Sequence, residues 1–214
     1  SGVTITLNAN GNTNFENLTG SKFADHLSGD AGNNIIHGGT NKSVDKDGTG
    51  DKIDGGAGFD TITGGDGGIN NTLSFALASQ ARTVGVIATI NPSDSVTVTN
   101  NGYGGKYNSV TNIQNLEGSH LNDTLTATGE SKLYGLSGDD KLISNLATAN
   151  KTIHLFGGDG TDTLTIDSSN SILNATTLLD GGAGEDTFNL AGNATAKNTI
   201  FLKLSDSGST KTVT

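Results

Sequence analysis

The chain has 214 residues, among them 32 glycines, one proline and no cysteine, and 22 acidic against 12 basic residues give a net charge of -10. Such a surface excludes nucleic acid and anionic membranes as natural partners, and the missing cysteines exclude disulfides and thiolate metal sites. The length suits one large all-β domain or two small ones, and no apolar run is long enough to insert into a membrane. Of the acids, 18 are Asp, and short carboxylates in Gly-rich turns favour binding of a hard cation.

The first residues predict a strand and no targeting signal. Val3, Ile5 and Leu7 alternate with polar residues, as in a half-buried strand. The basic and apolar regions of a signal peptide are missing. We therefore expect the chain to be cut from a longer protein.

A nine-residue repeat begins at Gly20. Most copies combine glycines at positions one, two or four with Asp at position six and a large apolar residue at position eight. Glycines at these positions permit the positive φ angles and close backbone approach of a sharp turn. The copies begin at Gly20, Gly29, Gly55, Gly64, Gly118, Gly135, Gly157 and Gly181.

The residues after each turn predict short strands of a solenoid. Their apolar residues are flanked by polar ones, so they can all point to one side. Two nonapeptides then form one coil, and turns stack along each edge. The expected inward row comprises Leu27, Ile36, Ile53, Ile62, Leu125, Leu142, Leu164 and Phe188.

The repeat resembles the RTX (repeats-in-toxin) nonapeptide G-G-x-G-x-D-x-U-x, where U is a large apolar residue. The copies at Gly55, Gly157 and Gly181 match every defined position. The resemblance implies an all-β fold: a calcium-binding parallel β-roll (β-solenoid) in two tandem modules with flanking strands. A flexible Gly- and Asp-rich linker is the alternative, but a linker does not hold an apolar residue at a fixed distance from Gly and Asp.

The resemblance also implies where several calcium ions bind, because position-six carboxylates and turn carbonyl oxygens share an ion with the next coil. Three turns depart from the pattern, with Asn34, Ile69 and Ser131 where Asp is expected. The expected metal-binding residues are Asp25, Gly29, Asp51, Gly55, Gly56, Gly58, Asp60, Gly64, Asp66, Asp123, Gly135, Asp140, Gly157, Gly158, Gly160, Asp162, Gly181, Gly182, Gly184 and Asp186.

A larger duplication divides the chain. Residues 13–21 correspond to residues 111–119 with a constant offset of 98. Between them, the alternation from Val84 to Ile90 is broken by Asn91-Pro92-Ser93-Asp94, which predicts a hairpin. We expect a first RTX module with N-terminal strands at 1–70, a strand-rich connection at 71–117, and a second RTX module with C-terminal strands at 118–214.

Catalytic motifs are missing from the sequence. The four histidines have no H-x-x-x-H spacing, and there is no G-x-S-x-G elbow or phosphate-binding loop. Asp139 and Asp140 could in principle act as acid and base, but Asp140 fills the ligand position of its repeat. The Thr-x-Thr pairs form no regular ladder that could bind ice, so we expect a protein that is not an enzyme.

What the resemblance implies about function is a structural, calcium-binding module of a secreted bacterial cell-surface protein. Surface-layer proteins and large adhesins share this Thr-, Asn- and Gly-rich, Cys-free composition. Type I secretion, folding outside the cell, and contact with neighbouring modules or copies of the same protein follow from that resemblance. The alternatives are the C-terminal RTX domain of a secreted protease, lipase or alginate epimerase, and the repeat region of a toxin.

Overall fold

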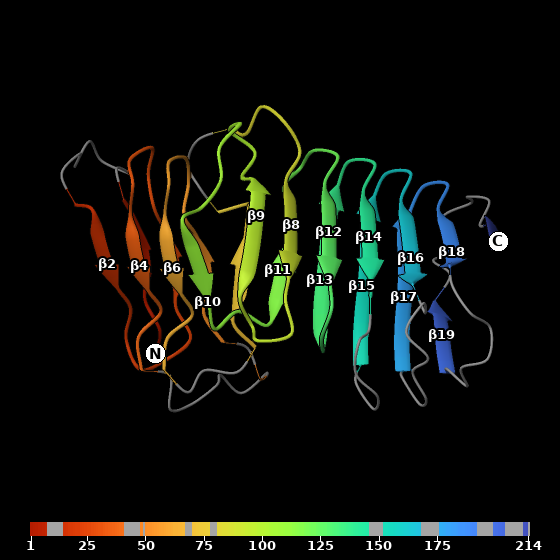
Figure 1. The fold of residues 1–214 in the computed structure, drawn as a ribbon, viewed down its shortest axis with the longest axis horizontal. Helices are drawn as coiled ribbons and strands as arrows, with labels where there is room; N and C mark the ends of the chain where they lie inside the picture. The colour runs from red at the N-terminus through yellow and green to blue at the C-terminus, as the bar shows by residue number, and fades with distance from the viewer. Residues whose placement is uncertain are drawn as a thin grey trace.

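The protein is described from a computed structural model, which covers residues 1–7, 15–40, 48, 50–66, 70–77, 81–145, 152–167, 176–191, 199–203 and 212–213. All regular elements in these residues are strands, wound into an elongated coil of two facing layers (Figure 1). No helix that could cross a membrane occurs in these ranges. The predicted all-β parallel β-roll is confirmed.

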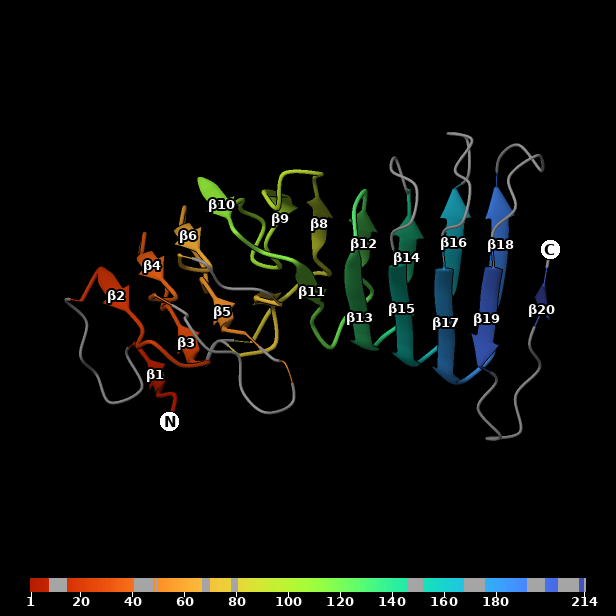
Figure 2. The ribbon, with the colours of Figure 1, turned by 90° about the horizontal axis from the view of Figure 1, so that it is seen from below.

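One layer is a single nine-stranded parallel sheet, here called sheet A, that runs the length of the molecule (Figure 2). Its strands, in spatial order, are β1 (Thr4–Thr6), β3 (His26–Ser28), β5 (Lys52–Asp54), β7 (Thr72–Ser74), β11 (Asn115–Glu117), β13 (Ser131–Ser137), β15 (Thr152–Asp159), β17 (Thr176–Ala183) and β19 (Thr199–Lys203).

The opposite layer consists of two sheets. Sheet B contains β10 (Ser109–Thr111), β6 (Thr61–Thr63), β4 (Ile35–His37) and β2 (Asn17–Thr19). Sheet C contains β20 (Thr212–Val213), β18 (Thr187–Ala191), β16 (Thr163–Asp167), β14 (Lys141–Ser144), β12 (Thr124–Ala127), β8 (Ile87–Ile90) and β9 (Val96–Asn100).

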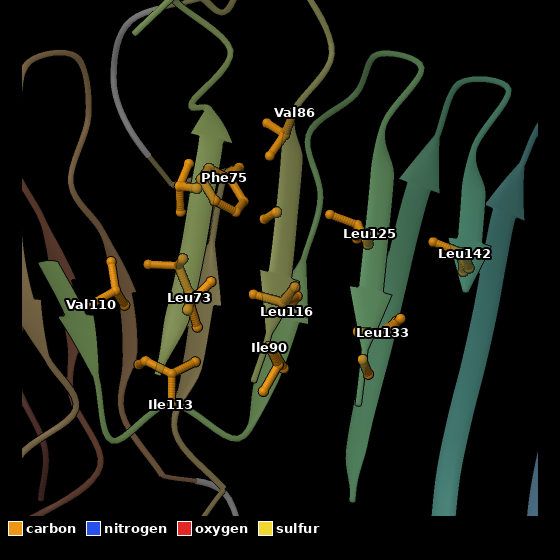
Figure 3. Close-up of a cluster of buried hydrophobic side chains, with 14 of the residues drawn as sticks. Leu73, Phe75, Val86, Ile90, Val110, Ile113, Leu116, Leu125, Leu133 and Leu142 are labelled. Carbon is orange, nitrogen blue, oxygen red and sulfur yellow. The ribbon is translucent and has the colours of Figure 1, made fainter. Parts of the chain in front are cut away.

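The apolar residue of each repeat lies in the core between the layers. In sheet A, Leu27 is in register with Ile53, and Ile53 with Leu73, so one coil places its apolar side chain directly on that of the next. All eight residues of the expected inward row are at most 1% exposed, which confirms that prediction. Figure 3 shows Leu116 and Leu133 from sheet A among the core side chains of the middle of the molecule.

The segment between the two runs of repeats is part of the same solenoid. β8 and β9 form the predicted antiparallel hairpin, while β7 and β11 are neighbours within sheet A. The division of the chain at 70 and 117 stays a prediction.

A buried ion pair lies beside the hairpin, and no sequence pattern predicts it. Arg82 Nη2 lies 2.6 Å from Asp54 Oδ1, and both side chains are at most 4% exposed. The guanidinium also donates to the Phe75 and Asn101 carbonyl oxygens, and the Tyr107 hydroxyl donates to Asp54 Oδ1. Every charge in this cluster therefore has a hydrogen-bonding partner, as a buried charge requires.

Candidate metal sites

The position-six aspartates are buried, although carboxylates are rarely found inside proteins without a partner. Each stands at the turn directly before a strand, so the winding of the coil places equivalent carboxylates one above another. All are at most 2% exposed: Asp25, Asp51, Asp60, Asp123, Asp140, Asp162 and Asp186.

One oxygen of each carboxylate joins successive coils. The Asp123 amide N–H donates to Asp140 Oδ1 at 2.8 Å, and the Asp140 amide N–H donates to Asp162 Oδ1 at 2.8 Å. In the first half, the Asp25 amide N–H donates to Asp51 Oδ1 at the same distance. These bonds run at the turns, where the sheet ladder has ended, and hold each aspartate in one orientation.

The second oxygen points at the first glycine of its own turn. A Cβ on Gly135 would clash with both Asp140 Oδ2 and the Gly157 carbonyl oxygen of the next coil. A carboxylate oxygen and a carbonyl oxygen thus converge over a glycine that leaves room for them. The same convergence occurs over four further glycines: Gly20, with Asp25 and Gly38; Gly38, with Asp51 and Gly64; Gly118, with Asp123 and Gly135; and Gly157, with Asp162 and Gly181.

The Oδ2 atoms of Asp60 and Asp140 are buried without a hydrogen-bond partner. Burial is the main cause that raises the pKa of Asp60 to about 7, with the nearby charges of Asp54 and Asp30 acting in the same direction. Burial also raises the pKa of Asp140 to about 8, and the charges of Asp123 and Asp162 add to it. A cation at these oxygens would remove the penalty on the charged form, so the residues fit Ca²⁺, which binds carboxylate and carbonyl oxygens.

The turn glycines at positions two and four take up backbone angles that side chains disfavour. Gly56 has a φ of 83° and Gly58 a φ of 102°, and a Cβ on either glycine would collide with a carbonyl oxygen of the neighbouring coil, that of Asp30 or Gly32. Four further glycines of the expected set also have a positive φ at their turns: Gly158, Gly160, Gly182 and Gly184. Gly65, which is outside the expected set, has one as well.

Not every expected residue lies in the buried row. Asp66 is exposed, and its amide N–H, not its carboxylate, contacts the neighbouring coil through the Gly39 carbonyl. Gly29 lies opposite the Gly55 carbonyl with Asn34 Oδ1 beside it, in place of a carboxylate. Gly55 lies beside Asp60 Oδ2, but the Tyr107 ring stands where the next coil would supply a carbonyl. Gly181 lies beside Asp186 Oδ2.

The position-six residue of the Gly64 turn is Asn71, not Ile69. Ile69 lies outside the described residues, while Asn71 directly precedes β7 and accepts the Asp51 amide N–H on Oδ1 at 2.9 Å. Two extra residues in this turn moved the true equivalent away from the ninefold frame. Sequence reasoning also left Gly38 out of the set, because an insertion separates it from Asp51 although both form one turn.

The acid turns do not follow both edges throughout. In the second half, the position-six aspartates directly precede the strands of sheet C. On the opposite edge, where the turns lead into the strands of sheet A, Ser131 and Ile153 are in register instead of aspartates. In the first half, Asp51 precedes a strand of sheet A and Asp60 precedes a strand of sheet B, where the turn of the neighbouring coil has Asn34 in the equivalent place.

The acids do not gather into a cluster. Among the described residues, no three of the His, Asp and Glu side chains are close enough together to hold a metal ion. Each acid turn has a single position-six carboxylate, so the remaining ligands of an ion would be backbone carbonyl oxygens and water. Calcium accepts such a set because it takes six to eight oxygens in flexible geometry.

Comparison with protein families agrees with this geometry. A model of the RTX calcium-binding nonapeptide repeat, in four copies, matches residues 10–41 and 47–68. The chain contains RTX repeats. RTX nonapeptide repeats bind calcium ions and are structural, not catalytic, units, and they occur in substrates of type I secretion. No curated protein matches the chain. The turns at Gly135 and Gly157 lie outside the matched residues but have the same convergence of oxygens.

Proposed function

We propose that this RTX region is a structural module of a secreted bacterial cell-surface protein, of the surface-layer or adhesin type, in which calcium drives folding and assembly. The proposed ligands are the Oδ2 atoms of the buried position-six aspartates and the carbonyl oxygens of the turn glycines around them. Asp66, which is exposed, is outside this set.

The convergence over Gly135 carries the proposal. Asp140 Oδ2 is buried without a hydrogen-bond partner and lies beside the Gly157 carbonyl oxygen, which belongs to the next coil. Two acceptors facing each other repel unless a cation or a proton lies between them. An ion bound there joins two successive coils, so each calcium stabilises the stack as well as its own turn.

The ends of the solenoid support an assembly role. β1 and β2 are terminal strands of sheets A and B at one end, and β19 and β20 are terminal strands of sheets A and C at the other. An edge strand presents backbone groups that can pair with another strand, and a solenoid end exposes a coil face unless it is covered. Neighbouring modules or copies of the same protein fit these ends.

The ligand assignment is tested by calorimetric counting of calcium in Asp140→Asn and in Asp139→Asn. Asp139 is the adjacent residue and is exposed, so the two variants differ in burial but not in the charge removed. The proposal predicts a lower calcium count for Asp140→Asn and the parental count for Asp139→Asn. Equal losses in both variants would show that the repeat frame does not define the ligands.

The assembly role is tested on the full-length protein by light scattering and electron microscopy with and without millimolar calcium. Calcium-dependent self-association or a lattice supports it. A monodisperse monomer in both conditions, with hydrolytic activity in the rest of the protein, would instead support an RTX domain that aids folding and secretion of an enzyme.

A further inference from the structure

The position-six residues that directly precede the strands of sheet A form a row, and their side chains change from carboxylates to amides along the molecule. The Asp25 amide N–H donates to Asp51 Oδ1, and the Asp51 amide N–H donates to Asn71 Oδ1 at 2.9 Å. The Asn71 amide N–H then donates to Gln114 Oε1 at 2.9 Å. Asn71 therefore occupies a step of the same ladder and is fully buried, like the aspartates before it.

The Asn71 side-chain nitrogen stands where an aspartate has its second oxygen. Nδ2 donates to the Gly64 carbonyl oxygen at 2.8 Å and to the Asn112 carbonyl oxygen at 3.1 Å. A Cβ on Gly64 would clash with Asn71 Nδ2 and with the Asn112 oxygen. In the Asp140 turn, the corresponding atoms are Asp140 Oδ2 and the Gly157 carbonyl oxygen.

The surroundings determine which way this amide faces. Oδ1 accepts the Asp51 N–H, while Nδ2 faces two carbonyl oxygens. The reversed amide would place an oxygen against both carbonyls and a nitrogen against an N–H donor, losing all three hydrogen bonds. The N–H groups of Asn71 thus supply the positive charge density that a cation supplies elsewhere in the row.

Asn34 shows that an asparagine in this frame does not always act in this way. Its Oδ1 accepts the Asp30 amide N–H at 2.9 Å and lies over Gly29 beside the Gly55 carbonyl. Its oxygen thus faces the turn as an aspartate oxygen does, and it remains a neutral candidate ligand. The metal-like position of the nitrogen is a property of Asn71.

We propose that the Asn71 amide takes the place of a calcium ion, so that this turn is a permanent, metal-free step and also a latent calcium site that a single Asn71→Asp substitution opens. The inference rests on the proposed calcium ligands. It makes the Gly38–Asp51 turn the last calcium site of the row entering sheet A, and it extends the metal-free region through Gln114, whose Nε2 donates to Asp94 Oδ2 at 3.1 Å.

The substitution Asn71→Asp keeps the oxygen that accepts from Asp51 and replaces the nitrogen by an oxygen. That oxygen then faces the Gly64 and Asn112 carbonyls, which is the arrangement of the calcium turns. We expect one additional calcium per chain by calorimetry. We also expect a lower melting temperature than the parent at low calcium and recovery at saturating calcium.

Asn108→Asp is the matched control, because Asn108 is exposed and its Nδ2 donates to a side-chain hydroxyl, Thr61 Oγ1, at 3.1 Å. It adds the same charge at an exposed position and should leave the calcium count unchanged. A parental count in Asn71→Asp, or an equal gain in both variants, overturns the inference.

Asn71→Ala decides the matter if Asn71→Asp does not fold. Removing the donors takes a hydrogen-bond partner from the buried Gly64 carbonyl and from the Asn112 carbonyl. The melting temperature should therefore fall by about 4–8 °C to the same extent at low and saturating calcium, with an unchanged calcium count. An unchanged melting temperature, or the loss of a calcium, overturns the inference. Asp140→Asn measured in parallel tests the proposed ligands separately, because its count changes whether or not Asn71 has this role.

Discussion

Removal of calcium should unfold the solenoid, and the structure allows the size of the effect to be worked out. Five turns bring an Asp carboxylate and the next coil's glycine carbonyl together, those of Asp25, Asp51, Asp123, Asp140 and Asp162. Extracellular calcium modules bind with dissociation constants of about 10⁻⁴ to 10⁻³ M. At about 10 mM calcium, each such site stabilises the folded state by about 1.4–2.7 kcal/mol.

Together, five independent sites contribute about 7–14 kcal/mol, which is comparable to the whole stability of a typical domain, about 5–15 kcal/mol. Without the ion, the buried carboxylates also repel one another along the row. Far-UV circular dichroism in excess chelator should therefore show loss of the strand signal, and magnesium at equal concentration should restore it poorly because it prefers a small, rigid octahedral site. An unchanged spectrum and melting temperature in chelator would refute this reasoning.

Three further perturbations test the buried carboxylates, the ion pair and the turn glycines separately. In chelator, any residual fold should melt at a higher temperature at about pH 5.5 than at about pH 8.5, because burial raises the pKa of Asp60 to about 7 and of Asp140 to about 8 from 3.8. The folded chain then binds more protons than the unfolded chain between about pH 4 and pH 8. The stability gained from protonated Asp60 and Asp140 is therefore lost as the pH rises through their folded-state pKa values. A melting temperature that falls on acidification would contradict the burial of these carboxylates. Arg82→Leu leaves Asp54 buried without its ion pair and should lower the free energy of unfolding by about 3–5 kcal/mol at saturating calcium. The double variant Asp54→Leu/Arg82→Leu should lose less free energy of unfolding. Chemical denaturation measures both variants, and a single variant as stable as the parent would argue against the ion pair. Gly135→Ala should lower the calcium count by one because its Cβ collides with Asp140 Oδ2 and the Gly157 carbonyl oxygen. The control Gly129→Ala, whose Cβ would meet only Pro92 Cα at 4.0 Å, should leave the count unchanged. Equal counts in the two variants would rule out the space over Gly135 as the ion's position.

The repeat pattern predicted the fold well because the nine-residue period links backbone and core. Glycines determine where the chain turns, and the apolar residue two positions after Asp must then point inward, so Leu27, Ile62 and Phe188 are all buried as expected. This relation is local, and a local relation can be read from sequence.

The details that sequence reasoning missed depend on insertions or on contacts between distant residues. Asn71 and Gly38 belong to turns with extra residues, so counting by nine does not find them. The partners Asp54 and Arg82 are 28 residues apart and meet only in the folded chain, where the segment before β8 lies against the end of β5. The edge on which the acid turns continue after residue 118 depends on how many residues each coil contains, which the repeat alone does not determine.

The most direct test of calcium binding between successive coils is anomalous X-ray diffraction from crystals of the calcium-loaded protein. We expect calcium peaks at the turns, among them one between Asp140 Oδ2 and the Gly157 carbonyl oxygen and one between Asp51 Oδ2 and the Gly64 carbonyl oxygen, and no peak beside Asn71 Nδ2. Turns without calcium peaks, with Asp140 Oδ2 hydrogen-bonded to protein or water instead, would contradict calcium binding there.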